Sequence, residues 1–235
     1  MTRLPVEDAI PDLLAALKAD RLAVLQAPPG AGKTTRVPLA MLEAGLCDTR
    51  IVMLEPRRLA TRAAATRMAE TLGEQVGKTV GFRMRGEAKT SPSTRIEVVT
   101  EGILTRMIQA DPTLDGIGAV IFDEFHERSL NADLGLALAL EVRETLRPDL
   151  ILLAMSATLD AEPVADLMGA QVITSEGQSF PVETHWLDKP IGPKARWDVE
   201  MAALIRRAVS ETRGGILAFL PGEGEIRRVA QALGD

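Results

Sequence analysis

The chain has 235 residues, of which 46% are apolar and 26% charged, and its net charge is −6 at pH 7. This balance is typical of a globular protein with ample material for a core. The single cysteine, Cys47, excludes an intrachain disulfide and a multi-cysteine metal site, and it fits a reducing compartment. The sequence shows neither an apolar run of membrane-spanning length nor the apolar core of a signal peptide, so we expect a soluble, cytoplasmic protein.

The first distinctive stretch follows a short apolar strand. An apolar-periodic segment over residues 6–19 predicts a helix, and residues 22–25 predict the strand. The chain then runs Ala27-Pro28-Pro29-Gly30-Ala31-Gly32-Lys33-Thr34-Thr35, and residues 33–44 are suited to a second helix. A strand, a loop of small residues, Gly-Lys-Thr and a helix together indicate a phosphate-binding loop.

Each residue type in this loop has a physical role. Gly30 and Gly32 allow the backbone to turn so that its N–H groups converge on phosphate oxygens. Lys33 is placed to reach the β- and γ-phosphates of ATP, and the Thr34 hydroxyl to bind Mg²⁺. The strict pattern begins with glycine, whereas Ala27 stands there. The alternative is a glycine-rich turn with a chance lysine.

Apolar strands and helices alternate from residue 50 to residue 155. The predicted strands are residues 50–55, 80–85, 95–99, 119–122 and 150–155, and the predicted helices are 57–72, 101–109 and 132–146, the last with Asn131 as its N-cap. This alternation predicts an α/β fold, in which helices cover both faces of a mostly parallel sheet.

Positive charge is concentrated in one window of this acidic chain. Residues 56–90 hold eight lysines and arginines against three glutamates, a local charge of +5. Such a surface suits an anionic polymer bound at one place. A solvated helix face would explain the charge equally well.

Two acidic residues follow the predicted strand 119–122. Asp123 and Glu124 stand at the carboxyl end of a parallel strand, where such sheets bind ligands. Asp123 is suited to hold Mg²⁺ with Thr34, and Glu124 to orient or deprotonate the water that attacks the γ-phosphate. Acidic pairs after strands are common by chance, but together with Gly32-Lys33-Thr34 this pair indicates ATP hydrolysis.

Further short segments occur in a characteristic order. They are Pro56-Arg57-Arg58-Leu59-Ala60, Thr100-Glu101-Gly102, Ser156-Ala157-Thr158, Phe180-Pro181-Val182-Glu183 and Phe219-Leu220-Pro221-Gly222. Together with residues 30–34 and Asp123-Glu124-Phe125-His126, they resemble the motifs of the superfamily 2 helicases of the DEAH type. The resemblance is closest to the bacterial HrpB-type ATP-dependent helicases, and it implies a RecA-like P-loop NTPase fold. Phe125 replaces the usual alanine, so its ring must pack away from the metal site.

The resemblance implies a role for each matching residue. The implied catalytic set is Lys33, Asp123, Glu124 and His126, with Thr34 and Asp123 as Mg²⁺ ligands. ATP would be bound by Pro29, Gly30, Ala31, Gly32, Lys33, Thr34 and Thr35, and by Arg67 through stacking on adenine, although Arg67 fits a solvated helix face nearly as well. Arg57, Arg58 and Thr100 would contact the backbone of a single strand, with RNA favoured over DNA. Ser156 and Thr158 would couple the γ-phosphate to closure of two lobes.

The composition shifts near residue 178. We expect residues 1–177 to form a first RecA-like domain and residues 178–235 the truncated beginning of a second, with helices at about 198–212 and from 223 and a strand at 216–220. Motifs V and VI of the family, whose arginines contact the γ-phosphate, and the C-terminal domains would lie beyond residue 235. We therefore expect this chain to bind ATP·Mg²⁺ weakly and to hydrolyse it poorly.

The function expected from these observations is that of a helicase or translocase driven by ATP hydrolysis. One alternative is a nucleic-acid-binding or scaffold module that ATP only switches, which a damaged hydrolytic carboxylate would favour, but Glu124 is intact. Another is a transporter ATPase, whose Leu-Ser-Gly-Gly-Gln signature the sequence lacks.

Overall fold

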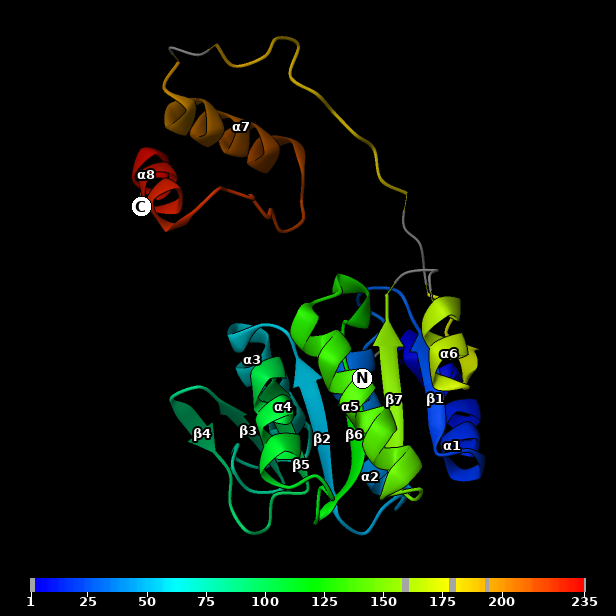
Figure 1. Cartoon of the computed structure of the whole chain (residues 1–235). Coiled ribbons are helices and arrows are strands. Elements are labelled where there is room, and N and C mark those ends of the chain that lie inside the picture. Colours follow the sequence, from blue (N-terminus) through cyan, green and yellow to red (C-terminus); the bar gives the residue numbers. More distant parts are fainter. Residues whose placement is uncertain (1–2, 158–160, 178–180, 193–194, 235) are drawn as a thin grey trace. The chain divides into compact units, whose positions relative to one another are not determined.

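Eight strands form one sheet in the computed structural model, which describes residues 3–157, 161–177, 181–192 and 195–234. The sheet lies in the first of the two units into which the chain divides, residues 1–179 and 180–235. Its order is β4-β3-β5-β2-β6-β7-β1-β8, with parallel neighbours except in the β3–β4 hairpin (Figure 1). The strands are β1 (Leu22–Gln26), β2 (Arg50–Glu55), β3 (Val80–Met84), β4 (Glu87–Lys89), β5 (Ile96–Thr100), β6 (Ile117–Phe122), β7 (Ile151–Ser156) and β8 (Gln171–Thr174).

Helices cover both faces of this sheet. One face carries the 3₁₀ turn η1 (Pro5–Asp8) with α1 (Ile10–Ala19), α2 (Lys33–Glu43) and α3 (Arg58–Thr71). The other carries α4 (Glu101–Ala110), α5 (Leu130–Thr145) and α6 (Glu162–Met168). Figure 1 shows α4 and α5 in front of the strands and α2 behind them. None of the helices among the described residues is long and apolar enough to cross a membrane.

The central strands are apolar along their whole length because both of their faces are covered. In β2, Ile51 and Met53 belong to the core beneath α1, α2 and α3. Val52 and Leu54, the residues between and after them, belong to the core beneath α4, α5 and α6. A doubly covered parallel sheet requires such continuous apolar runs. The predicted α/β fold is therefore confirmed.

The strand order brings the loops that matter to one edge of the sheet. Because neighbouring strands are parallel, the loops that follow β1, β2, β5, β6 and β7 all leave from the same edge. The consecutive strands β1 and β2 are separated by β6 and β7. Such a change in strand order opens the crevice in which α/β sheets bind their ligands.

The predicted N-cap of the helix over residues 132–146 was wrong. α5 begins at Leu130, and its N-cap is Ser129, whose Oγ accepts a hydrogen bond from the N–H of Ala132 at 3.0 Å. Asn131 lies inside the first turn. Serine and asparagine cap helices about equally well, so composition could not decide between them.

The second unit contains two of the predicted helices, α7 (Trp197–Glu211) and α8 (Glu223–Leu233). The predicted strand at 216–220 was wrong, because these residues are irregular and mostly exposed. Leu217 is 78% exposed and Phe219 is 84% exposed. A strand needs a neighbour to pair its backbone groups. No described residue of this unit forms one.

Candidate nucleotide-binding site

The loop between β1 and α2 turns at two glycines. Gly30 and Gly32 have φ angles of 78° and 91°, in the left-handed region that glycine adopts readily. A Cβ on Gly32 would also approach Leu4 Cδ1 to 2.7 Å. The N–H of Ala27 donates to the carbonyl of Ser156 at 3.0 Å, which ties the loop to the end of β7. The loop thus leads directly into the N-terminus of α2, a favourable place for a phosphate.

Lys33 and Glu124 meet from the loops that follow β1 and β6. Nζ of Lys33 donates to Oε1 of Glu124 at 2.9 Å, and the two side chains are 5% and 25% exposed. A buried ammonium group requires a negative partner, and Glu124 supplies it. Phosphate oxygens carry the same charge and would compete for the same ammonium group.

Asp123 is buried beside this pair and has one engaged oxygen. Its Oδ1 accepts a hydrogen bond from the N–H of Glu124 at 2.8 Å. Its Oδ2 is buried and has no hydrogen-bond partner among the described residues. A buried carboxylate oxygen without a partner costs free energy, and a bound cation would remove that cost.

The surroundings of Asp123 fit Mg²⁺ bound together with a nucleotide. The Thr34 hydroxyl lies near Asp123 and acts to lower the pKa of that carboxyl. The described residues contain no group of three or more His, Cys, Asp or Glu side chains suited to a metal. Mg²⁺ commonly uses one or two protein groups and completes its shell with phosphate oxygens and water. Thr34 and Asp123 match that requirement.

Glu55 is a residue of this site that sequence reasoning missed. It ends β2 and is buried. Burial, with the charges of Asp123 and Glu124, raises the pKa of Glu55 to about 8. Burial likewise raises the pKa of Asp123 to about 6. Glu55 therefore keeps its proton at neutral pH, beside Asp123. A glutamate that ends a buried strand belongs to no chemical motif, so only the fold reveals it.

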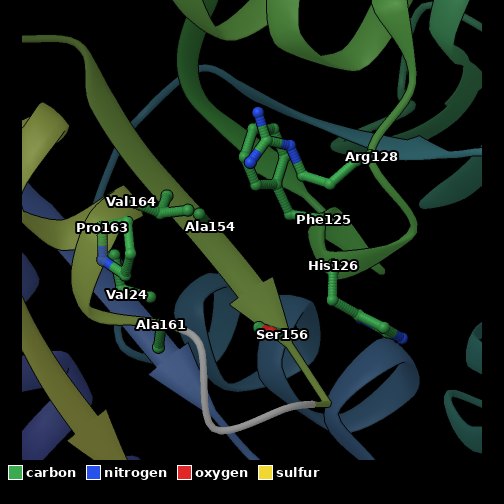
Figure 2. Close-up of a pocket in the computed structure, with 9 residues that line it drawn as sticks. All are labelled: Val24, Phe125, His126, Arg128, Ala154, Ser156, Ala161, Pro163 and Val164. Carbon is green, nitrogen blue, oxygen red and sulfur yellow. The ribbon is translucent and has the colours of Figure 1, made fainter.

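Phe125 packs into the core on the α4–α5 side of the sheet. Its ring is buried and meets Phe122 edge to face, with 6.0 Å between the ring centroids. The Arg128 guanidinium lies 5.8 Å from the centre of the same ring. Figure 2 shows Phe125 and Arg128 together at a pocket of about 280 Å³, with His126 pointing away from them. The core therefore accommodates the large residue, which leaves the phosphate loop clear.

His126 links the loop after β6 to the loop after β7. The N–H of Ala157 donates to Nδ1 of His126 at 3.2 Å. Nδ1 of His126 also lies 3.4 Å from Oε2 of Glu124. The buried Ser156 ends β7 next to Ala157, whereas Thr158 lies outside the described residues. His126 thus holds two loops together.

A cavity of about 510 Å³ adjoins the phosphate loop. Its lining residues come from four segments and are Thr34, Thr35, Glu55, Arg57, Ala60, Ala63, Ala64, Arg67, Glu124 and Glu127. The alanines of α3 leave space against which a flat base can lie. Arg67 stands on the same helix, largely exposed, and its Nη1 lies 3.7 Å from Glu70. The adenine stacking expected of Arg67 stays a prediction, and Arg67 lines a cavity beside the phosphate loop.

Arg57, Arg58 and Thr100 lie at the ends of neighbouring strands. Thr100 ends β5, and the two arginines follow β2, which pairs with β5. Arg57 forms an ion pair with Glu127, and Nη1 of Arg58 donates to the carbonyl of Arg85 at 2.9 Å. The three predicted strand-binding residues are thus side by side, on the β2 and β5 side of the phosphate loop.

Part of the basic window is neutralised inside the sheet. Glu97 of β5 is fully buried and forms ion pairs with two arginines. Its Oε1 lies 2.7 Å from Nε of Arg83, and its Oε2 lies 2.8 Å from Nη1 of Arg50. Arg62 is paired with Glu87 at 2.5 Å. Glu97 and Glu127 lie outside the window of residues 56–90, so their contacts with Arg83 and Arg57 offset part of the local charge of +5.

Comparison with known families agrees with this geometry. A family model described as DEAD/DEAH box helicase matches residues 7–167, which include the phosphate loop, Asp123 and Glu124. The chain belongs to the DEAD/DEAH box helicase family. The resemblance inferred from the motifs is therefore confirmed, and so is the RecA-like fold.

Individual relatives place this helicase chain more narrowly. It is 51% identical to the ATP-dependent RNA helicase HrpB of Escherichia coli over 234 residues, which cover 99% of the chain and 29% of the relative. It is 35% identical to E. coli HrpA over 238 residues, which cover 98% of the chain and 18% of that relative. The crystal structure of the E. coli DEAH/RHA helicase HrpB matches with a TM-score of 0.91 at 52% identity, covering 98% of the chain and 29% of that structure. The chain thus spans less than a third of these relatives.

Proposed function

We propose that the protein uses ATP hydrolysis to translocate along or unwind nucleic acid, with single-stranded RNA favoured over DNA. The observation that carries this proposal is the contact of Lys33 with Glu124 beside the unpartnered oxygen of Asp123. These groups form a phosphate site, a cation site and a hydrolytic carboxylate within one loop cluster. The preference for RNA is supported by the relatives HrpB and HrpA, both named ATP-dependent RNA helicases.

Hydrolysis requires the present ion pair to open. Lys33 would exchange the carboxylate of Glu124 for phosphate oxygens, and Glu124 would then accept a proton from the attacking water. Thr34 and Asp123 would hold Mg²⁺, which supplies charge neutralisation of the phosphates when it is bound with ATP. Glu55, which keeps its proton, would donate to Asp123 and hold it in place.

Strand binding would use the neighbouring strand ends. Arg57, Arg58 and Thr100 would contact sugar and phosphate groups, which position a strand without reading its sequence. Arg67 would stack on adenine in the cavity along α3. Ser156 and Thr158 would couple the γ-phosphate to lobe closure, supported by the hydrogen bond between Ala27 and Ser156 and by His126, which holds Ala157.

The two units support a domain proposal. Residues 1–177 would form the first RecA-like domain and residues 178–235 the beginning of the second, with further helicase domains in the part of the relatives that this chain does not span. The single cysteine, Cys47, supports action in the reducing cytoplasm.

The deciding experiment is ATP hydrolysis by the complete protein, titrated separately with single-stranded RNA and single-stranded DNA at fixed salt. We expect stimulation by both, and stronger stimulation by RNA. Fixed salt is essential because phosphate contacts weaken as ionic strength rises. Basal hydrolysis that neither strand stimulates would contradict the helicase proposal and favour an ATP-switched module.

A further inference from the structure

One ion pair joins the proposed nucleotide site to the proposed strand site. Arg57 contacts Glu127, and both residues line the cavity beside the phosphate loop. Arg57 follows β2 and Glu127 follows β6, which are adjacent in the sheet. Beyond β2 lies β5 with Thr100, and beyond β6 lie β7 and β1 with the phosphate loop. The ion pair therefore spans the boundary between the two sites.

Glu127 is also directly connected to Glu124, the proposed base. Glu124 is the N-cap of the 3₁₀ turn η2 (Phe125–Glu127), and the N–H of Glu127 donates to the carbonyl of Glu124 at 2.9 Å. The backbone is left-handed at both ends of the turn, with φ of 50° at Glu124 and 45° at Arg128. This conformation is unfavourable for residues that carry a Cβ, and it persists only where the surroundings impose it.

The surroundings hold the turn at both ends. Arg128 binds Asp133 through two hydrogen bonds, of 3.0 Å and 3.1 Å, and Lys33 holds Glu124. Within the turn, His126 accepts a hydrogen bond from the N–H of Ala157, and Glu127 contacts Arg57. The contact between Glu127 and Arg57 thus lies one short turn away from Glu124.

We propose that Glu127 is a positioning residue that holds Arg57 until a phosphate of the nucleic-acid strand replaces Glu127 as the partner of Arg57. This inference rests on the proposed function. A carboxylate and a backbone phosphate are both anions that accept hydrogen bonds from a guanidinium group, so they compete for Arg57. After Glu127 has lost Arg57, its negative charge is no longer neutralised. Glu127 and Glu124 line the same cavity, so their two carboxylates then repel each other. Strand binding thereby alters the position of the hydrolytic carboxylate.

The chain offers a matched control for this ion pair. Arg62 of α3 pairs with Glu87 of β4, and their side chains are 53% and 37% exposed, against 69% and 33% for Arg57 and Glu127. Glu87→Gln and Glu127→Gln therefore change the net charge equally, next to the same basic helix. Glu87 lies in the hairpin, outside the turn that carries Glu124.

The first test is binding of a labelled oligouridine, and of the matching deoxyoligonucleotide, to the complete protein at fixed salt. We expect Glu127→Gln to tighten strand binding about two- to fivefold, the range expected for release of an exposed ion pair. Glu87→Gln should change it clearly less. In an Arg57→Gln background, Glu127→Gln should give no gain, because no arginine is left to release. If Glu127→Gln unfolds at a lower temperature than the unchanged protein, Glu127→Asp replaces it. Glu127→Asp keeps the negative charge, so its strand affinity should stay close to that of the unchanged protein.

The second readout is the affinity for a fluorescent ATP analogue with Mg²⁺, measured with and without saturating strand. The quantity compared is the ratio of the ATP-analogue affinity with the strand to that without it. We expect this ratio to differ from one in the unchanged protein and in Glu87→Gln, and to move towards one in Glu127→Gln. Three results would each overturn the inference without contradicting the helicase proposal. They are equal strand affinities of Glu87→Gln and Glu127→Gln, an affinity ratio of one in the unchanged protein, and the same affinity ratio in Glu127→Gln as in the unchanged protein. If the unchanged chain binds neither oligonucleotide, the proposed strand-binding function fails, and the inference fails with it.

Discussion

At the scale of single residues, the site gathers one ammonium group and three carboxyl groups from three strand ends. Lys33 neutralises Glu124, whereas Asp123 and Glu55 share a buried region in which two negative charges cannot both be stabilised. A proton on Glu55 resolves the conflict in the absence of a cation. The arrangement explains why Asp123 is suited to a divalent ion and why Glu124 must leave Lys33 before it acts.

The roles of Lys33 and Glu124 are separable by substitution. Lys33→Ala should abolish detectable ATP binding, because it removes the cation that faces the phosphates. Glu124→Gln should keep ATP binding and lower the hydrolysis rate about 10²–10⁴-fold, the usual contribution of a general base. Equilibrium binding of an ATP analogue and steady-state hydrolysis distinguish the two. Turnover that survives in Glu124→Gln would show that another group is the base.

The raised pKa of Glu55 predicts that the stability of the fold depends on pH. Its pKa is raised from 4.5 to about 8 in the folded chain, so the folded state retains a proton that the unfolded state has lost. The stabilisation is complete below about pH 4.5 and is lost as the pH rises towards the folded pKa. Between pH 6 and pH 8, we expect the free energy of unfolding without nucleotide to fall by about 2 kcal/mol.

Glu55→Gln is the control, because glutamine has no proton to lose over this range. Urea unfolding at the two pH values should show a smaller decrease for Glu55→Gln than for the unchanged chain. Parallel decreases in the two proteins would mean that Glu55 does not keep its proton in the folded state.

At the scale of elements, the turn after β6 is held by several different contacts. Asp123, Glu124 and Glu127 lie within or beside η2, and each makes a different contact, to the backbone, to Lys33 and to Arg57. Ser129 and Asp133 then anchor the start of α5 directly behind this turn. The helix start therefore bears on the geometry of the site as well as on the stability of the core.

The capping of α5 can be tested with two neighbouring substitutions. Ser129→Ala should lower the free energy of unfolding by about 1 kcal/mol, because the N–H of Ala132 loses its acceptor. Asn131→Ala should change it by less than about 0.5 kcal/mol, since Asn131 lies within the first turn. Chemical denaturation of both variants gives the comparison. The reverse order of effects would restore Asn131 as the cap.

At the scale of the whole molecule, the strand order decides which sites are neighbours. β6 lies between β2 and β7, so the loop that carries Glu124 stands between the arginines after β2 and the end of β7 with Ser156. Nucleotide and strand would thus be bound at one edge, on either side of this loop. This adjacency provides a short physical route for coupling the two sites.

The hydrolytic activity of the 235-residue chain alone is a test at this scale. We expect it to bind ATP·Mg²⁺ weakly and hydrolyse it slowly, because it spans only 29% of the relative HrpB and none of its segments matches motifs V and VI, whose arginines would contact the γ-phosphate. Such arginines contribute about 10³–10⁵ in rate in other NTPases. The measurement is steady-state phosphate release, compared with a longer chain that includes those motifs. Equal rates would contradict the expectation.

Several features could be read from the sequence because they depend on local chemistry. Gly30, Gly32 and Lys33 indicated a phosphate loop through residue type and spacing, and the apolar runs at residues 50–55 and 119–122 indicated buried parallel strands. β8 and α6 were not anticipated, since their short segments carry weak periodicity. The strand expected at residues 216–220 was wrong because pairing depends on a neighbour, which the local sequence does not report.

The sequence by itself thus determined the fold class, the phosphate loop and the acidic pair Asp123 and Glu124, since each follows from residues close together along the chain. Only the tertiary structure decided that Glu55 is buried near Asp123 with a raised pKa and that Glu127 holds Arg57. Both contacts join the end of β2 to the end of β6. The reason is physical: the order of strands in a sheet is set by packing over the whole domain, and it brings together residues whose separation in the sequence gives no sign of their contact.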